Sequence, residues 1–249
     1  MTYKPREYWE TRLKRDFSLG ASGHIGFSRY YNRFMYKLKV RVLEEALKRH
    51  KIKVRGSSVL DIGAGTGFFV KQYIKKQAGK VTGIDFSEVS VASLNKLFPA
   101  QHFYRFDAGS DTAPLEEKFD IINVFDVLYH IIEPQGFRKA IENISRFARP
   151  GAWIFITDAL GEKAITDAHV CYRQLPEYRE ALRRQGIDIV EAVPVFNLMG
   201  RSPCMNDKKI TSRICAKLID SLAWFIYWID RIYRPQSGRG IQLLICRKK

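Results

Sequence analysis

The sequence predicts an α/β protein in which helices cover both faces of a doubly wound, mainly parallel sheet. Short apolar runs alternate with helix-like segments between residues 58 and 158, a pattern typical of parallel sheets. The first run ends in a turn with three alternate glycines, and acidic residues follow the ends of further runs. Because ligands of such sheets bind at the carboxyl ends of the strands, we expect the functional site there.

The first 55 residues form a basic helical extension in this interpretation. Apolar side chains at near-helical spacing predict helices over 7–17 and 30–50, joined by a glycine-rich connector at 18–26. The segment carries 15 Lys and Arg against 5 Asp and Glu. We expect it to act as an extension or lid beside the domain that follows.

The domain at 56–249 is expected to follow the alternating pattern. We predict helices at 66–77, 87–97 and 136–148 and strands at 58–62, 80–85, 102–106, 119–124 and 152–158. A helix near 176–185, a strand near 187–195 and a final strand at 241–246 come next, with a helical insertion at 197–239 before the final strand.

The glycine turn at 61–67 indicates a nucleotide-like ligand. Asp85 lies 22 residues after Gly63 and ends the second strand-like run, which is the position of an acid that binds a ribose diol. The dinucleotide fingerprint needs a third glycine where Phe68 stands. Asp61, two residues before the first glycine, would repel a pyrophosphate but favour a cationic ligand. This favours S-adenosylmethionine (SAM), which carries a sulfonium and an amine, over a dinucleotide.

Five segments in order then resemble the core of the class I SAM-dependent methyltransferases. They are residues 61–69 and 83–85, Arg105 to Ala108, and residues 119–131 and 149–158. The resemblance covers residues 57–160 and is of the small-molecule methyltransferase type. It implies a Rossmann-like sheet of seven strands with the last one antiparallel.

The resemblance and the spacing together assign the cofactor site. Gly63 and Gly65 would let the cofactor lie against the turn, Asp61 would orient its amino group directly or through water, and Asp85 would hold the ribose. Asp107 and Ala108 would flank the adenine. Phe125 would pack along the cofactor, and Arg33 or a neighbouring tyrosine would reach its carboxylate from the extension. The full set of cofactor-binding candidates is Asp61, Gly63, Ala64, Gly65, Gly67, Asp85, Phe86, Asp107, Ala108, Phe125 and Arg33.

His130 is the first candidate for a general base, because it follows the fourth strand near the expected methyl group. In the resembling family a histidine here is frequently structural, so both roles stay open. Tyr129 and Asp158 are secondary catalytic candidates, and Asp126 is expected to line the site or cap a helix. His24, in the glycine-rich connector, is a candidate lid residue. No metal site is predicted.

Charge and motifs point to different acceptors. The chain carries a net charge of +16, which lies in the two flanking segments and not in the core, and this favours an anionic partner. Yet residues 123–126 lack the prolines of base-modifying relatives, no cysteine follows the fourth or fifth strand, and only Glu133 stands where protein-arginine enzymes need two glutamates.

The function predicted is therefore methyl transfer from SAM to an O or N of a small, lipid-like or amphipathic molecule, with nucleic acid less favoured. One alternative is an RNA or protein methyltransferase docked through its basic segments. Another is a non-catalytic SAM-binding scaffold.

The insertion adds a predicted helix at 211–233. Its apolar stripe runs from Ile214 to Ile232, while Trp224 and Trp228 fall off the stripe or at its border, beside cations. Such a face suits an anionic membrane surface, a dimer contact or a lid, or else an adjacent helix covers it. The charged N-terminus and the scattered cysteines predict a cytoplasmic protein with reduced thiols, in one reading peripheral at a membrane.

Overall fold

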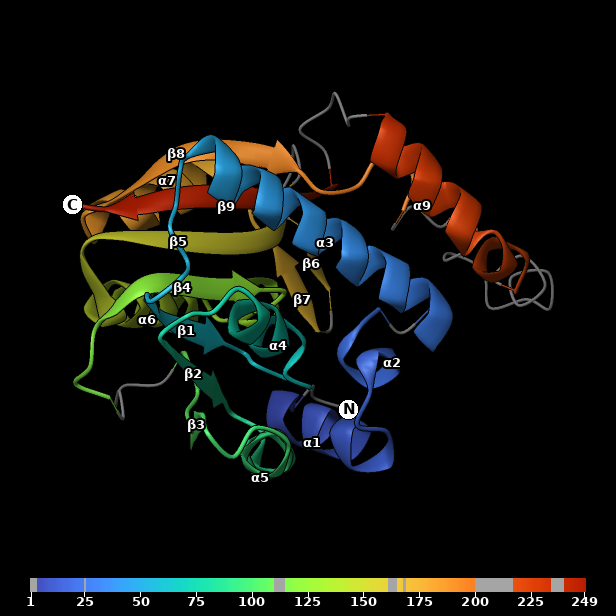
Figure 1. Ribbon diagram of the computed structural model, residues 1–249, viewed down its shortest axis with the longest axis horizontal. Coiled ribbons are helices and arrows are strands. Elements are labelled where there is room, and N and C mark those ends of the chain that lie inside the picture. Colours follow the sequence, from blue (N-terminus) through green and yellow to red (C-terminus); the bar gives the residue numbers. More distant parts are fainter. Residues whose placement is uncertain are drawn as a thin grey trace.

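The central sheet has seven strands in the order β3-β2-β1-β4-β5-β9-β8 (Figure 1). The computed structural model describes residues 4–24, 26–109, 115–160, 165–167, 169–199, 217–233 and 240–249 of the 249-residue chain. The strands are β1 (Ser58–Ile62), β2 (Lys80–Asp85), β3 (His102–Arg105), β4 (Phe119–Phe125), β5 (Ala148–Leu160), β8 (Ile187–Pro194) and β9 (Gly240–Lys248). The predicted Rossmann-like fold is confirmed.

Strands β1 to β5 are parallel, and their registers bring their carboxyl ends to one edge. Ile62 pairs with Ile84 of β2 and with Val124 of β4. Beyond β5, β9 runs antiparallel to both of its neighbours, as expected for the last strand. A two-stranded hairpin of β6 (Ile165–Asp167) and β7 (Val170–Tyr172) follows β5 and was not predicted.

Helices cover both faces of the sheet and enclose two apolar cores. On one face lie α3 (Arg29–Arg49), α4 (Phe68–Lys75) and α5 (Glu88–Leu97), whose apolar residues join one core. On the other lie α6 (Pro134–Phe147) and α7 (Leu175–Arg184), which build the second (Figure 1). The central strands, such as β1, are buried on both faces, which explains their nearly continuous apolar sequences.

The N-terminal segment folds back to the ligand-binding edge. It consists of α1 (Pro5–Arg15), the short α2 (Leu19–Ser22) and the long α3. Ser28 caps α3 by accepting hydrogen bonds from the backbone of Tyr30 and Tyr31. Figure 1 shows α1 beside α5 at the end of the sheet where the turn after β1 lies. The short helix α2 lies inside the connector that the sequence suggested would be irregular.

The insertion contributes α9 (Ala223–Ile232), which packs against α3. Its buried residues are Ala223, Tyr227 and Asp230. Of the predicted apolar stripe, Ile226 packs partly against the core, whereas Leu222, Phe225 and Ile232 are exposed. Neither α3 nor any other described segment covers Trp224 and Trp228, which are exposed. The start of the expected helix, 211–216, lies outside the described residues. Within the described part of the chain no helix is long and apolar enough to span a bilayer.

Candidate functional site

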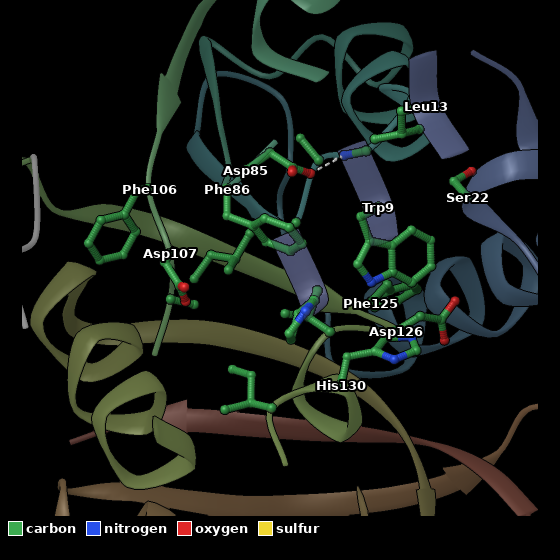
Figure 2. A pocket seen from close by; sticks show the side chains of 18 of the residues that line it. Trp9, Leu13, Ser22, Asp85, Phe86, Phe106, Asp107, Phe125, Asp126 and His130 are labelled. Atoms are coloured by element: carbon green, nitrogen blue, oxygen red, sulfur yellow. Dashed lines mark hydrogen bonds between the residues drawn. The ribbon is translucent and has the colours of Figure 1, made fainter. Parts of the chain in front are cut away.

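A cavity of about 320 Å³ opens at the carboxyl ends of β1, β2 and β4 (Figure 2). Its volume falls in the range of small-molecule sites. The lining comes from the turn after β1, the ends of β2 to β4 and the N-terminal helices. It includes Arg6, Trp9, Leu13, Ser22, Tyr36, Gly63, Ala64, Gly65, Phe68, Asp85, Phe86, Phe106, Asp107, Ala108, Phe125, Asp126 and His130.

The glycine turn forms one wall of the cavity. The backbone N–H groups of Gly63 and Ala64 donate to the carbonyl of Ile84, at 2.8 and 3.1 Å. Gly63, Gly65 and Gly67 all take positive φ values of +73°, +52° and +76°, which glycine adopts without strain. Gly63, Ala64 and Gly65 line the cavity as expected.

Gly67 has a packing role instead of a lining role. It is not among the cavity residues. A Cβ at this position would lie 2.6 Å from Leu94 and 2.7 Å from Phe98. Its missing side chain therefore allows α5 to approach the start of α4. This corrects the expectation that Gly67 contacts the cofactor.

Asp85 lies at the end of β2 and faces the cavity (Figure 2). Its Oδ2 accepts a hydrogen bond from the Gly65 N–H at 2.8 Å, and its Oδ1 accepts one from the Ser87 N–H at 2.9 Å. Burial raises its pKa, and these hydrogen bonds oppose the rise. The carboxylate is thus fixed against the turn with lone pairs left for hydroxyl donors.

Asp61 does not reach the cavity. Its side chain is buried, and its Oδ1 accepts a hydrogen bond from Asn123 Nδ2 at 2.6 Å. Burial raises the pKa of Asp61 to about 7. Asp61 joins β1 to β4 beneath the turn and does not line the cavity, so its orientation of the cofactor's amino group through water stays a prediction.

The end of the cavity near β3 matches the predicted adenine site. Phe86, Phe106, Asp107 and Ala108 line it. The Gly109 N–H donates to Asp107 Oδ1 at 2.9 Å, and Arg6 of α1 lies 3.5 Å from Asp107 Oδ2. Aromatic walls with a carboxylate at the rim suit a flat ring that carries an amino group.

The opposite end contains Phe125, the last residue of β4, and Asp126, which follows it. Asp126 has a φ of +60°, and its Oδ1 accepts a hydrogen bond from Thr157 Oγ1 at 3.1 Å. Its Oδ2 forms an ion pair with Lys39 of α3, whose side chain is only 6% exposed. This pair joins the N-terminal segment to the edge of the sheet. The expectation that Asp126 lines the site is confirmed.

His130 lines the same end of the cavity and contacts Trp9, with ring centroids 5.1 Å apart (Figure 2). Its Nδ1 lies 3.1 Å from the carbonyl oxygen of His169. A carbonyl can only accept, so the proton resides on Nδ1 and Nε2 is the acceptor nitrogen. Burial lowers the pKa of His130 to about 4, so the ring is neutral at pH 7.

Arg173 holds the segment that carries His130. This buried side chain donates to the carbonyls of Leu128, Ile131 and Ile132 at 3.2, 2.7 and 3.2 Å. Its guanidinium also lies 4.0 Å from the centre of the Phe137 ring. Arg173, which directly follows β7, therefore fixes the short 3₁₀ turn η1 (Leu128–His130). The sequence did not reveal this role.

Besides Asp61 and Gly67, three further predicted site residues lie away from the cavity lining. Tyr129 is next to His130, with ring centroids 4.3 Å apart, but its ring is not among the lining residues. Asp158 is fully buried in the sheet, where it accepts a hydrogen bond from the Tyr178 hydroxyl. Arg33 lies on the exposed side of α3. The structure therefore brings neither Asp158 nor Arg33 to the cavity.

Several lining residues were missed because they come from the N-terminal helices. Arg6, Trp9 and Leu13 of α1 and Tyr36 of α3 reach across the cavity. The only signal in the sequence was the near-helical spacing of Trp9 and Leu13, which indicated an apolar face without saying what it covers.

Comparisons with known proteins agree with this geometry. A family model described as "Methyltransferase domain" matches residues 31–192. The ubiquinone biosynthesis O-methyltransferase of Hydrogenovibrio crunogenus is 27% identical over 108 residues, which cover 42% of this chain and 43% of that enzyme. An O-methyltransferase of Penicillium expansum is 24% identical over 208 residues, 76% of this chain and 73% of that protein.

Among solved structures, the magnesium protoporphyrin IX methyltransferase of Synechocystis PCC 6803, solved with bound SAM, has a TM-score of 0.62 at 16% identity. The match covers 98% of this chain and 95% of that one. At this identity the likeness concerns the fold. The chain spans about half the length of the curated relatives that match best, 43% and 56% in two cases.

Proposed function

Because the chain belongs to the methyltransferase-domain family, we propose that it transfers a methyl group from SAM to an oxygen or nitrogen of a small or amphipathic acceptor. The observation that carries the proposal is the single cavity that joins the glycine turn, the Asp85 carboxylate and the His130 ring. One end of this cavity has the donors and acceptors for a nucleoside, and the other has a neutral base.

The residues of the cavity fit SAM. Asp85 would accept hydrogen bonds from the ribose hydroxyls, and Asp107 would accept one from the adenine amine between Phe86 and Phe106. Gly63 and Gly65 expose backbone where a larger residue would intrude. Bound SAM would supply an electrophilic methyl group, so the protein's task is mainly to position the acceptor and exclude water.

His130 is suited to take a proton from the acceptor. Its Nε2 is the unprotonated nitrogen, and the His169 carbonyl and the Trp9 ring orient the imidazole. Burial makes it a weak base. A weak base suffices, because a hydroxyl becomes strongly acidic while its oxygen is being alkylated.

The acceptor is proposed to be largely apolar. Trp9, Tyr36, Phe68 and Phe125 give the cavity aromatic walls, which favour an aromatic or lipid-like group. The curated relatives are O-methyltransferases by name, which supports a hydroxyl as the reacting group.

SAM binding is tested first, by calorimetry. Asp85→Ala is expected to weaken SAM binding at least about a hundredfold, because a charge-assisted hydrogen-bond pair to the ribose is lost. Asp188→Asn, at the far end of β8, is the matched control and should bind like the wild type. Equal affinity of the Asp85 variant and the wild type would contradict the cofactor assignment.

Turnover is tested with methyl-labelled SAM and a fractionated cell extract. Label in the organic-soluble small-molecule fraction supports the proposal. Label confined to RNA or protein would instead support a macromolecular substrate, and tight SAM binding without transfer to any fraction would support a scaffold. His130→Ala should lower the rate about a hundredfold or more at unchanged SAM affinity, and a wild-type rate would remove His130 from the reaction.

A further inference from the structure

One side of the insertion helix exposes an unusual set of large apolar residues. We call the residues Leu222, Trp224, Phe225, Trp228, Arg231 and Ile232 the tryptophan face. Trp224 is 54% exposed, Phe225 56% and Ile232 69%. The two indoles contact each other, with ring centroids 6.1 Å apart. Exposed apolar side chains normally occur singly, whereas a contiguous group marks a binding surface.

The acidic residues of this segment are occupied elsewhere. Asp230 is buried, and its carboxylate accepts hydrogen bonds from the backbone N–H groups of residues 197–199, at 3.1, 2.7 and 2.9 Å. Asp220 accepts from the Ser28 hydroxyl at 2.6 Å. Both carboxylates of the described stretch 217–233 thus accept hydrogen bonds from other parts of the protein.

The cations, in contrast, lie beside the exposed rings. The Arg231 guanidinium is 5.3 Å from the centre of the Trp228 ring. Arg41 of α3 donates to the Arg231 carbonyl, and the Lys37 ammonium lies at the contact of α3 and α9, 4.9 Å from the Phe34 ring. Arg33, one helical turn before Lys37, is exposed. Arg33, Lys37 and Arg41 thus follow one another at four-residue steps on α3, and Lys37 and Arg41 contact α9 at Tyr227 and Arg231.

We propose that the tryptophan face and the adjoining cations of α3 dock this protein on an anionic bilayer surface. Indole rings and long cationic side chains favour the boundary between head groups and acyl chains. Anionic lipids attract such cations over about one Debye length. A second copy of the chain would bring the same cations against each other, which disfavours a dimer through this face. Figure 1 shows α9 at the periphery beside α3, away from the sheet.

The test is co-sedimentation of the full chain with vesicles. We expect binding to phosphatidylcholine vesicles that contain phosphatidylglycerol, and about tenfold weaker binding to phosphatidylcholine alone or in high salt. The double variant Trp224→Ser, Trp228→Ser should lose binding about tenfold or more to both compositions. The charge variant Arg33→Glu, Lys37→Glu should lose the preference for the anionic vesicles.

Leu97→Ser is the matched control, because Leu97 of α5 is 58% exposed and lies on a different part of the surface. It should bind vesicles like the wild type. Three results would overturn the proposal: no binding to anionic vesicles, unchanged binding of the tryptophan variant, or a stable dimer in light scattering that this variant dissociates. The inference does not depend on the proposed reaction, since vesicle binding is measured without SAM or acceptor.

Discussion

At the scale of single residues, Gly63 shows how closely the turn packs against the segment after β4. A Cβ built on Gly63 lies 2.3 Å from Val127 Cγ2, and φ is +73°. Gly56 also has a positive φ, +80°, but nothing lies within 4 Å of its Cβ position. Replacing Gly56 by alanine therefore measures only the free-energy cost of the left-handed backbone. Replacing Gly63 adds the cost of the close contact with Val127.

We expect Gly56→Ala to lower the free energy of unfolding by about 1–2 kcal/mol, the cost of a left-handed backbone. Gly63→Ala should lower it by about 1–3 kcal/mol more, because the methyl group overpacks against Val127. It should also weaken SAM binding, whereas Gly56→Ala should not. Urea unfolding and calorimetry measure the two effects, and equal losses in both variants would contradict the contact.

Asp158 should make stability depend on pH. Burial raises its pKa to about 7 from a model-peptide value of 3.8. The folded protein therefore holds this proton more tightly than the unfolded chain does, so the stability from Asp158 is full below about pH 4 and is lost as pH rises through 7. The pKa of Asp61 is also raised, so its contribution to stability is likewise lost as pH rises. The pKa of His130 is lowered, so its contribution to stability is lost as pH falls.

Asp158→Asn removes one of these groups but keeps an oxygen that can accept from Tyr178. Relative to the wild type, the variant should gain about 2–4 kcal/mol of stability between pH 5 and pH 8. Urea unfolding at the two pH values measures this difference. Parallel pH curves for the two proteins would show that Asp158 ionises normally in the folded state.

At the scale of elements, the Lys39–Asp126 ion pair fixes α3 to the end of β4. Both side chains are largely buried, at 6% and 15% exposure. Removing one partner leaves an uncompensated charge, so Lys39→Met should destabilise the protein by about 3–5 kcal/mol. Adding Asp126→Asn should restore part of that loss. The exposed Glu180–Arg184 pair is the control, with an expected coupling below about 1 kcal/mol.

A double-mutant cycle in urea measures both couplings. If the buried pair coupled no more strongly than the Glu180–Arg184 pair, α3 would be held by apolar packing alone.

The central elements could be predicted from the sequence because their signals are local. Predicted strands at 58–62 and 80–85 coincide with β1 and β2, since buried parallel strands are short apolar runs with distinct ends. The strand predicted at 152–158 extends to Ala148–Leu160, because Ala148 pairs with Phe119 of β4 at one end and Ala159 and Leu160 pair with β9 at the other. Such pairing is not visible in a single segment.

The predictions that were wrong concern residues whose positions depend on contacts between distant segments of the chain. The sequence placed Asp61 at the cofactor, but Asn123 on the neighbouring strand takes its carboxylate. It described the insertion helix by an apolar stripe, yet the buried residues of the helix include Ala223 and Asp230, and Asp230 accepts hydrogen bonds from the backbone of residues 197–199. Gly63, Gly65, Asp85, Asp107, Ala108 and Phe125 do line the cavity, because each lies at a strand end or within a few residues after it.

At the scale of the whole molecule, α1 lines the cavity and contacts the start of α5. Glu10 accepts hydrogen bonds from the Ser87 hydroxyl and from the Val89 N–H, the latter at 3.3 Å. Both lie at the start of α5. Since Arg6, Trp9 and Leu13 line the cavity, we expect α1 to move when bound SAM leaves.

Glu10→Ala should therefore raise the dissociation rate of SAM about tenfold, because opening of the lid limits release. Glu7→Ala is the control on the same helix, since Glu7 pairs only with exposed Lys4 among the described residues. Stopped-flow fluorescence, with Trp9 as the reporter in the cavity wall, measures the rate. Equal rates for the two variants would mean that α1 does not gate release.

The position of β9 has a consequence for synthesis. This strand is the last in the sequence, yet it lies between β5 and β8, and Leu243 to Cys246 are fully buried. While the chain emerges from the ribosome, β8 has no described strand to pair with and β5 has one side open until residues 240–248 appear. The sheet is therefore completed only after residues 240–248 have been synthesised, and the facing edges of β5 and β8 stay unpaired until β9 inserts between them.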